Sequence, residues 1–400
     1  MPAVFAHRSF AFLWSARVLS TLAFHVQAVA VGWQLYDLTG SALDLGLVGL
    51  VQFVPMLLFT LVAGHAADRY DRRRILILSQ VVKAAGSVTL ALGTAGDWLD
   101  RESILATMAV VGAARVFEMP TLAALVPDVV PRPLIAPAVA WSVSANQTAR
   151  IVGPALGGLL YGLRPVEAYL TIAGLVVLAA GCAAAIRVAR AVRDREPATL
   201  EAVLSGIAFI RSRPVLLGTM SLDLFAVLLG GATALLPIYA RDILRTGPGG
   251  LGLLRAAPAV GALAMSVVLG QHPLQRRLGR TLFRAVMAFG AATVAFGLST
   301  NLTLSLVALA VLGASDVVSV VIRFSLVQIR TPDEMRGRVS AVHSLFTGTS
   351  NQLGEFESGL AAELFGPVPA VLIGGVGTML VAALWMRLFP ELPRIRTYEE

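Results

Sequence analysis

The 400-residue sequence contains few charged side chains and one cysteine. Charged residues make up 14% of it and aromatic residues 7%, whereas hydrophobic residues make up 56% and the mean hydropathy is +0.77. Soluble domains usually carry about 25% charged residues, so this composition excludes an ordinary soluble protein and predicts a membrane protein. The lone Cys182 lies in an apolar run without a second cysteine to pair with, which excludes a disulfide-stapled extracellular fold.

Signatures of catalysis are also missing. The sequence has no G-x-x-x-x-G-K-[ST] phosphate-binding loop and no G-x-S-x-G nucleophile motif, and no pair of its histidines has the spacing of metal ligands. We therefore expect a protein that is not an enzyme and that holds neither a metal nor another cofactor.

Apolar stretches between charged residues or Pro/Gly punctuation predict twelve membrane-spanning helices, each about 20 residues or longer. No removable signal peptide is recognisable at the start, so the first helix is expected to remain. The predicted spans are 10–37, 42–67, 74–94, 103–121, 137–162, 166–188, 215–239, 249–271, 282–299, 303–328, 339–365 and 368–389. The predicted fold class is an all-α membrane protein.

The basic residues predict the orientation of these spans. With the N-terminus inside, 22 of the 32 lysines and arginines fall in the cytoplasmic connections or tails, and six lie within the spans. The outer connections hold only four, which are Arg101, Arg164, Arg241 and Arg245. This asymmetry follows the positive-inside rule. It places both termini in the cytoplasm and explains the net charge of +8 without a nucleic-acid partner.

The longest connection divides the spans six and six. We predict an N-terminal six-helix bundle (1–190), a cytoplasmic linker with an amphipathic helix (191–214), a C-terminal six-helix bundle (215–390) and a cytoplasmic tail (391–400). The amphipathic helix either lies on the inner leaflet or packs on the protein. A shift of 208 residues carries Arg115 onto Arg323, so the halves look like duplicated, pseudo-symmetric copies with a substrate path between them.

The connection between spans 2 and 3 reads Gly64-His-Ala-Ala-Asp68-Arg69-Tyr-Asp-Arg72-Arg73, a G-x-x-x-D-R-x-x-R-R pattern. Here the sequence resembles the major facilitator superfamily, whose signature loop has this spacing at this position. The resemblance implies a conformational latch formed by Gly64, Asp68, Arg69 and Arg72, in which Asp68 pairs with arginine and with the N-terminus of helix 11. The alternative is that these arginines only fix the topology.

Span 5 contains Gly153-Pro154-Ala-Leu-Gly157-Gly158. Small residues let helices approach closely and proline bends them. Within the superfamily this run resembles the helix 5 signature of exporters. Together with the segments 32–41, 125–131 and 331–339, it makes nearly the whole chain similar to the exporter branch that contains enterobactin exporters and macrolide efflux proteins. The alternative is a packing seam of the kind found in any polytopic protein.

Placing an ionisable side chain in the bilayer costs free energy, so such residues within spans indicate the interior of the helix bundle or a water-filled path. We take Glu355 as the first candidate for a protonation site. The candidates for proton coupling are Glu355, Glu357, Asp316, Asp223, Glu118 and Arg115. The residues expected to line a substrate cavity are His25, Gln27, Asn146, Arg150, Arg323 and Asn351. Static ion pairs, such as Glu118 with Arg115 or Asp316 with Arg323, are the alternative interpretation.

Together these features predict a secondary active transporter, a proton-coupled exporter of a small amphipathic organic molecule such as a drug or siderophore, working by alternating access. Its expected partners are that substrate, protons and the lipid bilayer. The protein is expected to be a monomer in the bacterial cytoplasmic (inner) membrane. A lysophospholipid flippase and a membrane sensor or scaffold that moves nothing are the alternatives. Uptake in place of export is also open at this stage.

Overall fold

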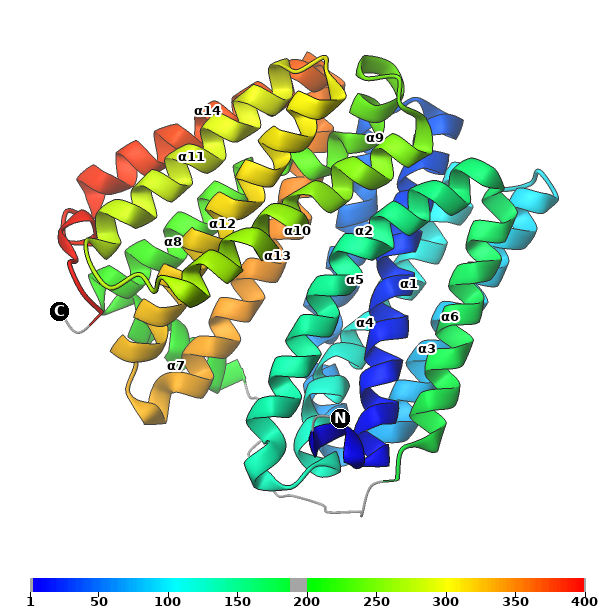
Figure 1. Ribbon diagram of the computed structural model, residues 1–400, viewed down its shortest axis with the longest axis horizontal. Coiled ribbons are helices and arrows are strands. Elements are labelled where there is room, and N and C mark those ends of the chain that lie inside the picture. The colour runs from blue at the N-terminus through cyan, green and yellow to red at the C-terminus, as the bar shows by residue number, and fades with distance from the viewer. Residues whose placement is uncertain (1–2, 188–199, 399–400) are drawn as a thin grey trace. The chain divides into compact units, whose positions relative to one another are not determined.

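The computed structural model describes residues 3–187 and 200–398, without the side chains of Leu61, Asp68, Leu200 to Val203 and Asp333, and the described chain is almost entirely helical (Figure 1). The long helices are α1 (Arg8–Thr39), α2 (Ala42–Arg69), α3 (Arg72–Ala95), α4 (Arg101–Val129), α5 (Ile135–Leu163), α6 (Pro165–Ala185), α8 (Pro214–Leu229), α10 (Gly247–Gln271), α11 (Leu278–Leu298), α12 (Leu302–Arg330), α13 (Asp333–Phe365) and α14 (Pro367–Leu388). The short elements are η1 (Ala3–Ala6), η2 (Arg132–Leu134), α7 (Leu200–Arg211), η3 (Ala232–Leu235), α9 (Leu236–Ile238), η4 (Tyr239–Ile243) and η5 (Leu392–Arg394).

Ten helical segments in the described chain are long and apolar enough to cross a membrane. They coincide with ten of the predicted spans, which confirms the all-α membrane fold. The other two predicted spans fall on α5 and α13, which are long enough but carry polar side chains along their length. A polar stripe lowers the mean hydropathy without shortening the helix, so the count of twelve crossings stays a prediction.

The chain divides into two compact units. Unit 1 comprises residues 1–40, 51–198 and 247–256, and unit 2 comprises residues 41–50, 199–246 and 257–400. The first part of α2 therefore belongs to unit 2 and the first part of α10 to unit 1. The predicted four-part division of the chain has different boundaries and stays a prediction.

In unit 1, α1 is the central helix. It packs against α4, α5 and α6, and α3 packs against α4 and α6. At one end of the unit a core forms around Phe10, Leu13, Leu76 and Leu125, all nearly inaccessible to solvent. Apolar burial of this kind fixes the helix faces and so determines which polar residues point inward.

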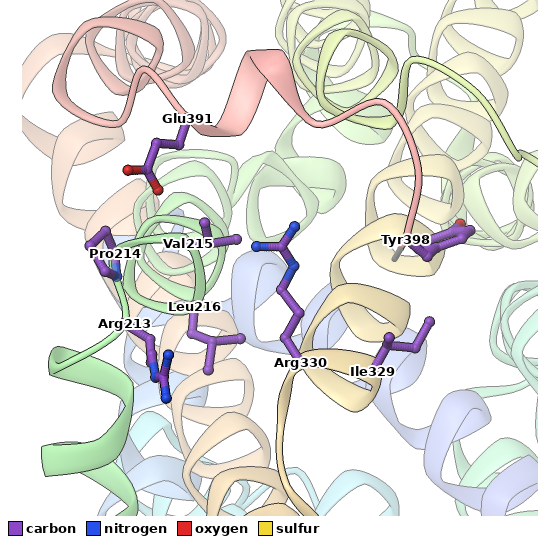
Figure 2. Close-up of a pocket in the computed structure, with 8 residues that line it drawn as sticks. All are labelled: Arg213, Pro214, Val215, Leu216, Ile329, Arg330, Glu391 and Tyr398. Carbon is purple, nitrogen blue, oxygen red and sulfur yellow. The ribbon is translucent and has the colours of Figure 1, made fainter. Parts of the chain in front are cut away.

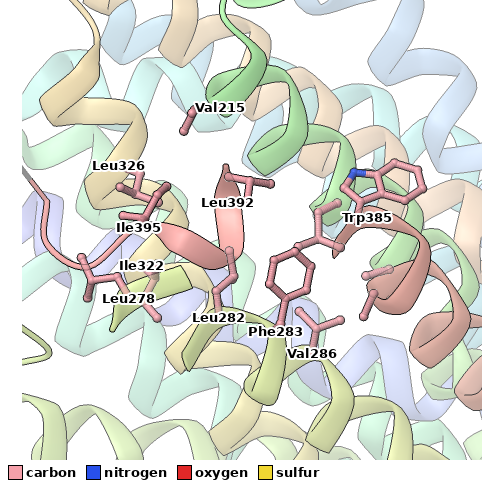
Figure 3. Close-up of a cluster of buried hydrophobic side chains, with 13 residues drawn as sticks. Val215, Leu278, Leu282, Phe283, Val286, Ile322, Leu326, Trp385, Leu392 and Ile395 are labelled. Atoms are coloured by element: carbon pink, nitrogen blue, oxygen red, sulfur yellow. The ribbon is translucent and has the colours of Figure 1, made fainter. Parts of the chain in front are cut away.

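In unit 2, α11 packs against α12 and α14, and α8 packs against α12, α13 and α14. Figure 3 shows the apolar core that joins α8, α11, α12 and α14 to the C-terminal segment through residues such as Phe283, Ile322 and Leu392. The C-terminal segment also hydrogen-bonds to the start of α11, because the Gly279 amide donates to the Ile395 carbonyl at 3.0 Å. These bonds satisfy backbone donors that a helix start otherwise leaves unpaired.

The predicted linker helix is present as α7. Its Ile210 is buried and its Ile207 partly buried in a cluster with Met220 on α8 and with Val339 and Val342 on α13. These contacts favour the alternative in which α7 packs on the protein.

The seventh predicted span is interrupted. Helix α8 ends at Leu229, and the chain continues after Gly230 and Gly231 through η3, α9 and the π-helical turn η4. A Cβ at Gly230 would lie 2.8 Å from the Phe289 ring, and one at Gly231 would overlap the Gly354 backbone. The two glycines thus permit close packing of this break on α11 and α13.

Candidate substrate and proton sites

A fully buried ion pair lies inside unit 1. The Lys83 ammonium on α3 is 2.6 Å from Oε2 of Glu118 on α4, and both side chains are at least 94% buried. Ser20 on α1 donates to Glu118 Oε1 at 2.5 Å, and the Gln80 amide donates to the same oxygen at 2.9 Å. Two helices, α1 and α3, therefore place hydrogen-bond donors around one carboxylate of α4.

Sequence analysis found Glu118 but missed Lys83. The expected partner of Glu118 was Arg115, three residues earlier on the same helix, whereas Lys83 is the partner that the geometry provides. The Arg115 guanidinium instead lies over the Phe24 ring of α1, with its carbon 3.3 Å from the ring centroid. A cation on an aromatic face gains electrostatic stabilisation from the ring.

Basic side chains converge around His25 of α1. Its electrostatic neighbours are Arg115 on α4, Arg150 on α5 and Arg255 in the first part of α10, all in unit 1. Arg150 is exposed and the other two are partly buried. Arg255 was not among the predicted cavity residues, because an isolated arginine in an apolar run has no local pattern. This basic group, His25 with the three arginines, is suited to an anionic ligand.

Two predicted cavity residues lie on the same helices. Asn146 on α5 accepts a hydrogen bond from Thr21 at 3.3 Å and is partly buried. Gln27 is buried, and its amide is 3.8 Å from the Met108 sulfur. Thr21, one turn before His25, therefore lies on the same face of α1 as His25, whereas Gln27 faces α4.

Unit 2 holds a second charged cluster. Arg323 on α12 forms an ion pair with Asp223 on α8, and its second nitrogen is 4.0 Å from Asp316. Thr347 on α13 donates to Asp223 at 3.5 Å. The predicted pair of Asp316 with Arg323 exists at the outer limit of distance, and Asp223 is the closer partner, which local spacing could not reveal.

This cluster borders a small cavity of about 20 Å³, lined by both aspartates, Ser319, Arg323 and apolar residues of α8 and α11. A volume of this size is enough for about one water molecule. Two carboxylates face one guanidinium here, so the cluster holds one negative charge in excess when both aspartates are ionised.

The polar stripe of α13 lies next to the first part of α2. Glu355 is partly buried, and a Cβ built at Gly49 would lie 3.0 Å from its Oε2 atom. The missing side chain at Gly49 thus makes room for the carboxylate. Glu357 is partly buried and accepts from Ser358 at 3.4 Å, and exposed Asn351 donates to its own helix at the Thr347 carbonyl.

In the signature loop, Arg72 links α2 to α4. It donates to the Asp128 carboxylate of α4 at 2.6 Å and to the Ala67 carbonyl of α2 at 2.8 Å. Gly64 and exposed Arg69 lie in the last two turns of α2. The side chain of Asp68 lies outside the described residues, so the latch stays a prediction.

The helix 5 motif forms close contacts. Gly153, Pro154, Gly157 and Gly158 are all buried in α5. A Cβ would lie 2.9 Å from the Val26 carbonyl at Gly157 and would overlap the Pro248 carbonyl of α10 at Gly158. The glycines thus bring α5 against α1 and against the first part of α10.

Another cavity lies elsewhere in unit 2. It has a volume of about 390 Å³ and is lined by the start of α8, the end of α12 and the C-terminal segment. Figure 2 shows Arg330 extending into it between Val215 and Tyr398. None of the predicted cavity or proton residues lines it, so it is distinct from both charged clusters.

Comparison with known proteins identifies the family. The family model described as transmembrane secretion effector, a group within the major facilitator superfamily, matches residues 2–399. The chain belongs to the major facilitator superfamily. The enterobactin exporter EntS of Citrobacter koseri is 26% identical over 98% of this chain and 94% of its own length, and that of Escherichia coli is 25% identical over the same shares.

Solved structures of the superfamily share the fold. A bacterial homologue of the human lysosomal transporter Spinster matches with a TM-score of 0.76 and 14% identity, covering 98% of each chain. A point mutant of the nucleoside transporter NupG matches with a TM-score of 0.74 and 12% identity, covering 95% of this chain and all of its own. Relatives and structural neighbours alike are transporters, which confirms that this superfamily member is a membrane transporter and not an enzyme.

Proposed function

We propose that the chain is a proton-coupled exporter of a small, amphipathic organic molecule that carries negative charge, located in the bacterial cytoplasmic membrane with both termini inside. The observation that carries this proposal is the basic group of unit 1, His25 with Arg115, Arg150 and Arg255. Guanidinium groups present planar sets of donors that match a carboxylate. An anionic substrate is therefore the ligand that the three arginines are suited to bind in each transport cycle.

The relatives support the direction and class of substrate. Enterobactin exporters are similar to this chain over nearly its whole length, and the small residues of α5 resemble the exporter signature. A siderophore or a comparable aromatic acid fits a site that combines arginines with Phe24 and the apolar faces of α1 and α5.

The proposed proton coupling uses the charged cluster of unit 2, formed by Asp223, Asp316 and Arg323. Asp223 and Asp316 share one guanidinium, so one of them can take up a proton without leaving Arg323 unpaired. Glu355 and Glu357 on α13 are the other carboxylates of unit 2 placed to do so. One proton moving down a potential of about 100 mV supplies about 2.3 kcal/mol, which sustains roughly a fifty-fold gradient of a neutral solute.

The transport cycle would use alternating access, with Asp68 of the signature loop as the latch. Neutralising Asp68 by Asp68→Asn should then favour the inward-facing state. Cysteine probes on the cytoplasmic side would report it as increased labelling, and unchanged labelling would remove Asp68 from the latch.

Transport in proteoliposomes tests the proposal directly. The purified protein is reconstituted, a pH gradient is imposed, and the flux of an anionic catecholate, a neutral drug and a cationic dye is compared. We expect gradient-driven flux of the anion that stops when an ionophore collapses the gradient. Arg150→Gln should raise the apparent KM for the anion about ten-fold or more, whereas equal flux of the cation would overturn the anionic class.

A further inference from the structure

Lysine occurs once in this chain. The sequence has 32 basic residues, and all but Lys83 are arginine. That single lysine is 5% exposed, inside unit 1, and forms an ion pair with Glu118. Arginine and lysine differ in one respect that matters inside a membrane, because a buried lysine can lose its proton and arginine cannot.

The surroundings of Lys83 are rich in positive charge. Lys83 and Arg17 on α1 are both attracted to the Glu118 carboxylate, and the charge of Arg115 on α4 acts on both Lys83 and Glu118. Two positive groups, Lys83 and Arg17, thus face one carboxylate in a region of low dielectric. The excess charge is reduced most simply when Lys83 becomes neutral, since neither arginine can release a proton.

The other helix packed on α3 adds no competing base. Helix α6 carries titratable side chains at Glu167, which pairs with Arg164, at Tyr169, which donates to Gln34, and at Cys182. The remaining partners of the pair are neutral: the Lys83 ammonium donates to Ser20 at 2.5 Å, and Gln80 donates to Glu118. The charge state of the cluster therefore depends on Lys83 and Glu118.

Two buried polar atoms of the cluster are left without a hydrogen bond in the described part of the chain. Within the described residues, Gln80 Oε1 and Arg17 Nε have no hydrogen-bond partner. A buried polar atom without a partner destabilises the fold, so a rearrangement that gives Arg17 Nε an acceptor removes that cost. Arg17 can take over Glu118 when Lys83 loses its charge, and the carboxylate then stays paired.

We propose that the Lys83–Glu118 pair is a proton-binding site of the transport cycle, in which Lys83 is the group that gains and loses the proton. On release, an N–H bond of the Lys83 ammonium breaks, its electron pair stays on nitrogen, and the proton passes to water. Glu118 remains ionised and exchanges its lysine partner for Arg17. Uptake reverses these steps. This inference rests on the proposed proton-coupled function and adds a site in unit 1 to the carboxylates of unit 2.

The test compares Lys83→Arg, which keeps a permanent charge, with Lys83→Met, which removes it. In proteoliposomes each variant should bind and exchange substrate across the membrane but lose flux driven by a pH gradient at least ten-fold. Tyr169→Phe is the control, because it removes one buried hydrogen bond to Gln34 in the same unit without a charge change; it should retain gradient-driven flux.

The unmodified protein is measured first, which separates the two proposals. If its flux does not respond to the gradient, the proposed proton coupling fails. If its flux responds and Lys83→Arg responds equally, Lys83 is not a proton carrier and the present inference is overturned.

A second measurement does not depend on how the variants fold. Because Lys83 is the chain's single lysine, the unmodified protein grown with [13Cε]lysine gives one side-chain NMR signal. We expect this signal to titrate within the pH range over which the gradient drives transport. A signal that keeps the shift of a charged ammonium throughout that range would overturn the proposal.

Discussion

At the scale of single residues, the charged groups inside the helices are partnered between helices. Lys83 on α3 meets Glu118 on α4, and Arg323 on α12 meets Asp223 on α8. Removing one member of a buried pair leaves the other charge uncompensated, which is costly. Such pairs therefore constrain the packing of the helices that carry them, whatever their part in transport.

The Arg72–Asp128 pair provides a stability test at this scale. Its side chains are 16% and 12% exposed, and Arg72 also holds two backbone carbonyls. Arg72→Gln should lower the free energy of unfolding by about 1.5–3 kcal/mol, the typical contribution of hydrogen bonds to charged groups. Denaturant unfolding in detergent measures this loss.

The neighbouring Arg74–Asp71 pair is the matched control, because Arg74 is 87% exposed. Arg74→Gln should change stability by less than about 0.5 kcal/mol. Equal losses at both arginines would mean that the loop's net charge, and not the Asp128 contact, stabilises unit 1.

Asp100 gives a pH-dependent prediction. Its carboxylate caps α4 by accepting from the Ser103 amide at 2.8 Å, and hydrogen bonds from the Ser103 side chain and amide hold the pKa of Asp100 below its ordinary value. Because the folded pKa is the lower one, the stabilisation is present above the unfolded value of about 3.9. It is lost as the pH falls through the folded pKa.

Hydrogen-exchange protection at the start of α4 measures this effect. Protection should fall in acid relative to other helix starts, and Asp100→Asn, which keeps a capping side chain, should remove that pH dependence. The same acid-induced loss in the asparagine variant would assign it to another group.

The sequence identified most of these charged residues but not their partners. Glu118 and Arg115 stand three residues apart, a spacing that favours a pair on one helix surface, whereas the observed partner lies 35 residues away in the chain. Local spacing describes one helix, and the partner is set by how three helices pack. Arg255 was likewise not predicted in the basic group, because helix packing and not local spacing brings it near His25.

At the scale of elements, glycines determine which helices approach closely. The predicted exporter motif in α5 proves to be a contact surface, where Gly157 touches Val26 of α1 and Gly158 faces Gly252 of α10. Most helix positions were predictable to within a few residues because apolar runs end at charges and turns, but α4 runs on to Val129 past the predicted end at 121, and α13 starts at Asp333 and not at 339. The break in the helix after Leu229 was not predictable. Its two glycines, Gly230 and Gly231, are required by contacts with Phe289 and Gly354, which are distant in the sequence.

Alanine substitution distinguishes glycines at close helix contacts from glycines with open space around them. Gly157→Ala should destabilise unit 1, because the new methyl group would lie 2.9 Å from a backbone oxygen that cannot move freely. Gly181→Ala on α6 meets no atom within 4 Å, and it should be neutral or stabilising by up to about 1 kcal/mol through helix propensity. Thermal unfolding of both variants in detergent measures the difference, and equal midpoints would show that α1 and α5 are loosely packed.

At the scale of the whole molecule, composition alone predicted a multi-pass membrane protein, and family membership confirms a transporter. Substrate choice is beyond such reasoning, because 56% apolar content is shared by carriers of every ligand class. The topology, in contrast, rests on the distribution of arginines and can be measured.

Single cysteines on a Cys182→Ala background measure the topology. Trp98 and Leu163 are exposed residues next to predicted outer connections, and Arg8 and Arg394 are exposed near the termini. An impermeant maleimide should label cysteines at 98 and 163 in intact cells, and those at 8 and 394 only after permeabilisation. Labelling of position 8 in intact cells would reverse the orientation.

Helices α2 and α10 each begin in one unit and end in the other, changing over at residues 50/51 and 256/257. Each carries a proline nearby, Pro55 in α2 and Pro258 in α10, and a proline has no amide hydrogen to offer the carbonyl four residues before it. The carbonyls of Val51 and Leu254 thus lack their usual helical donor close to the crossover. Each helix therefore lacks one backbone hydrogen bond near the residue at which it passes from one unit to the other, and a helix is most readily kinked at such a proline.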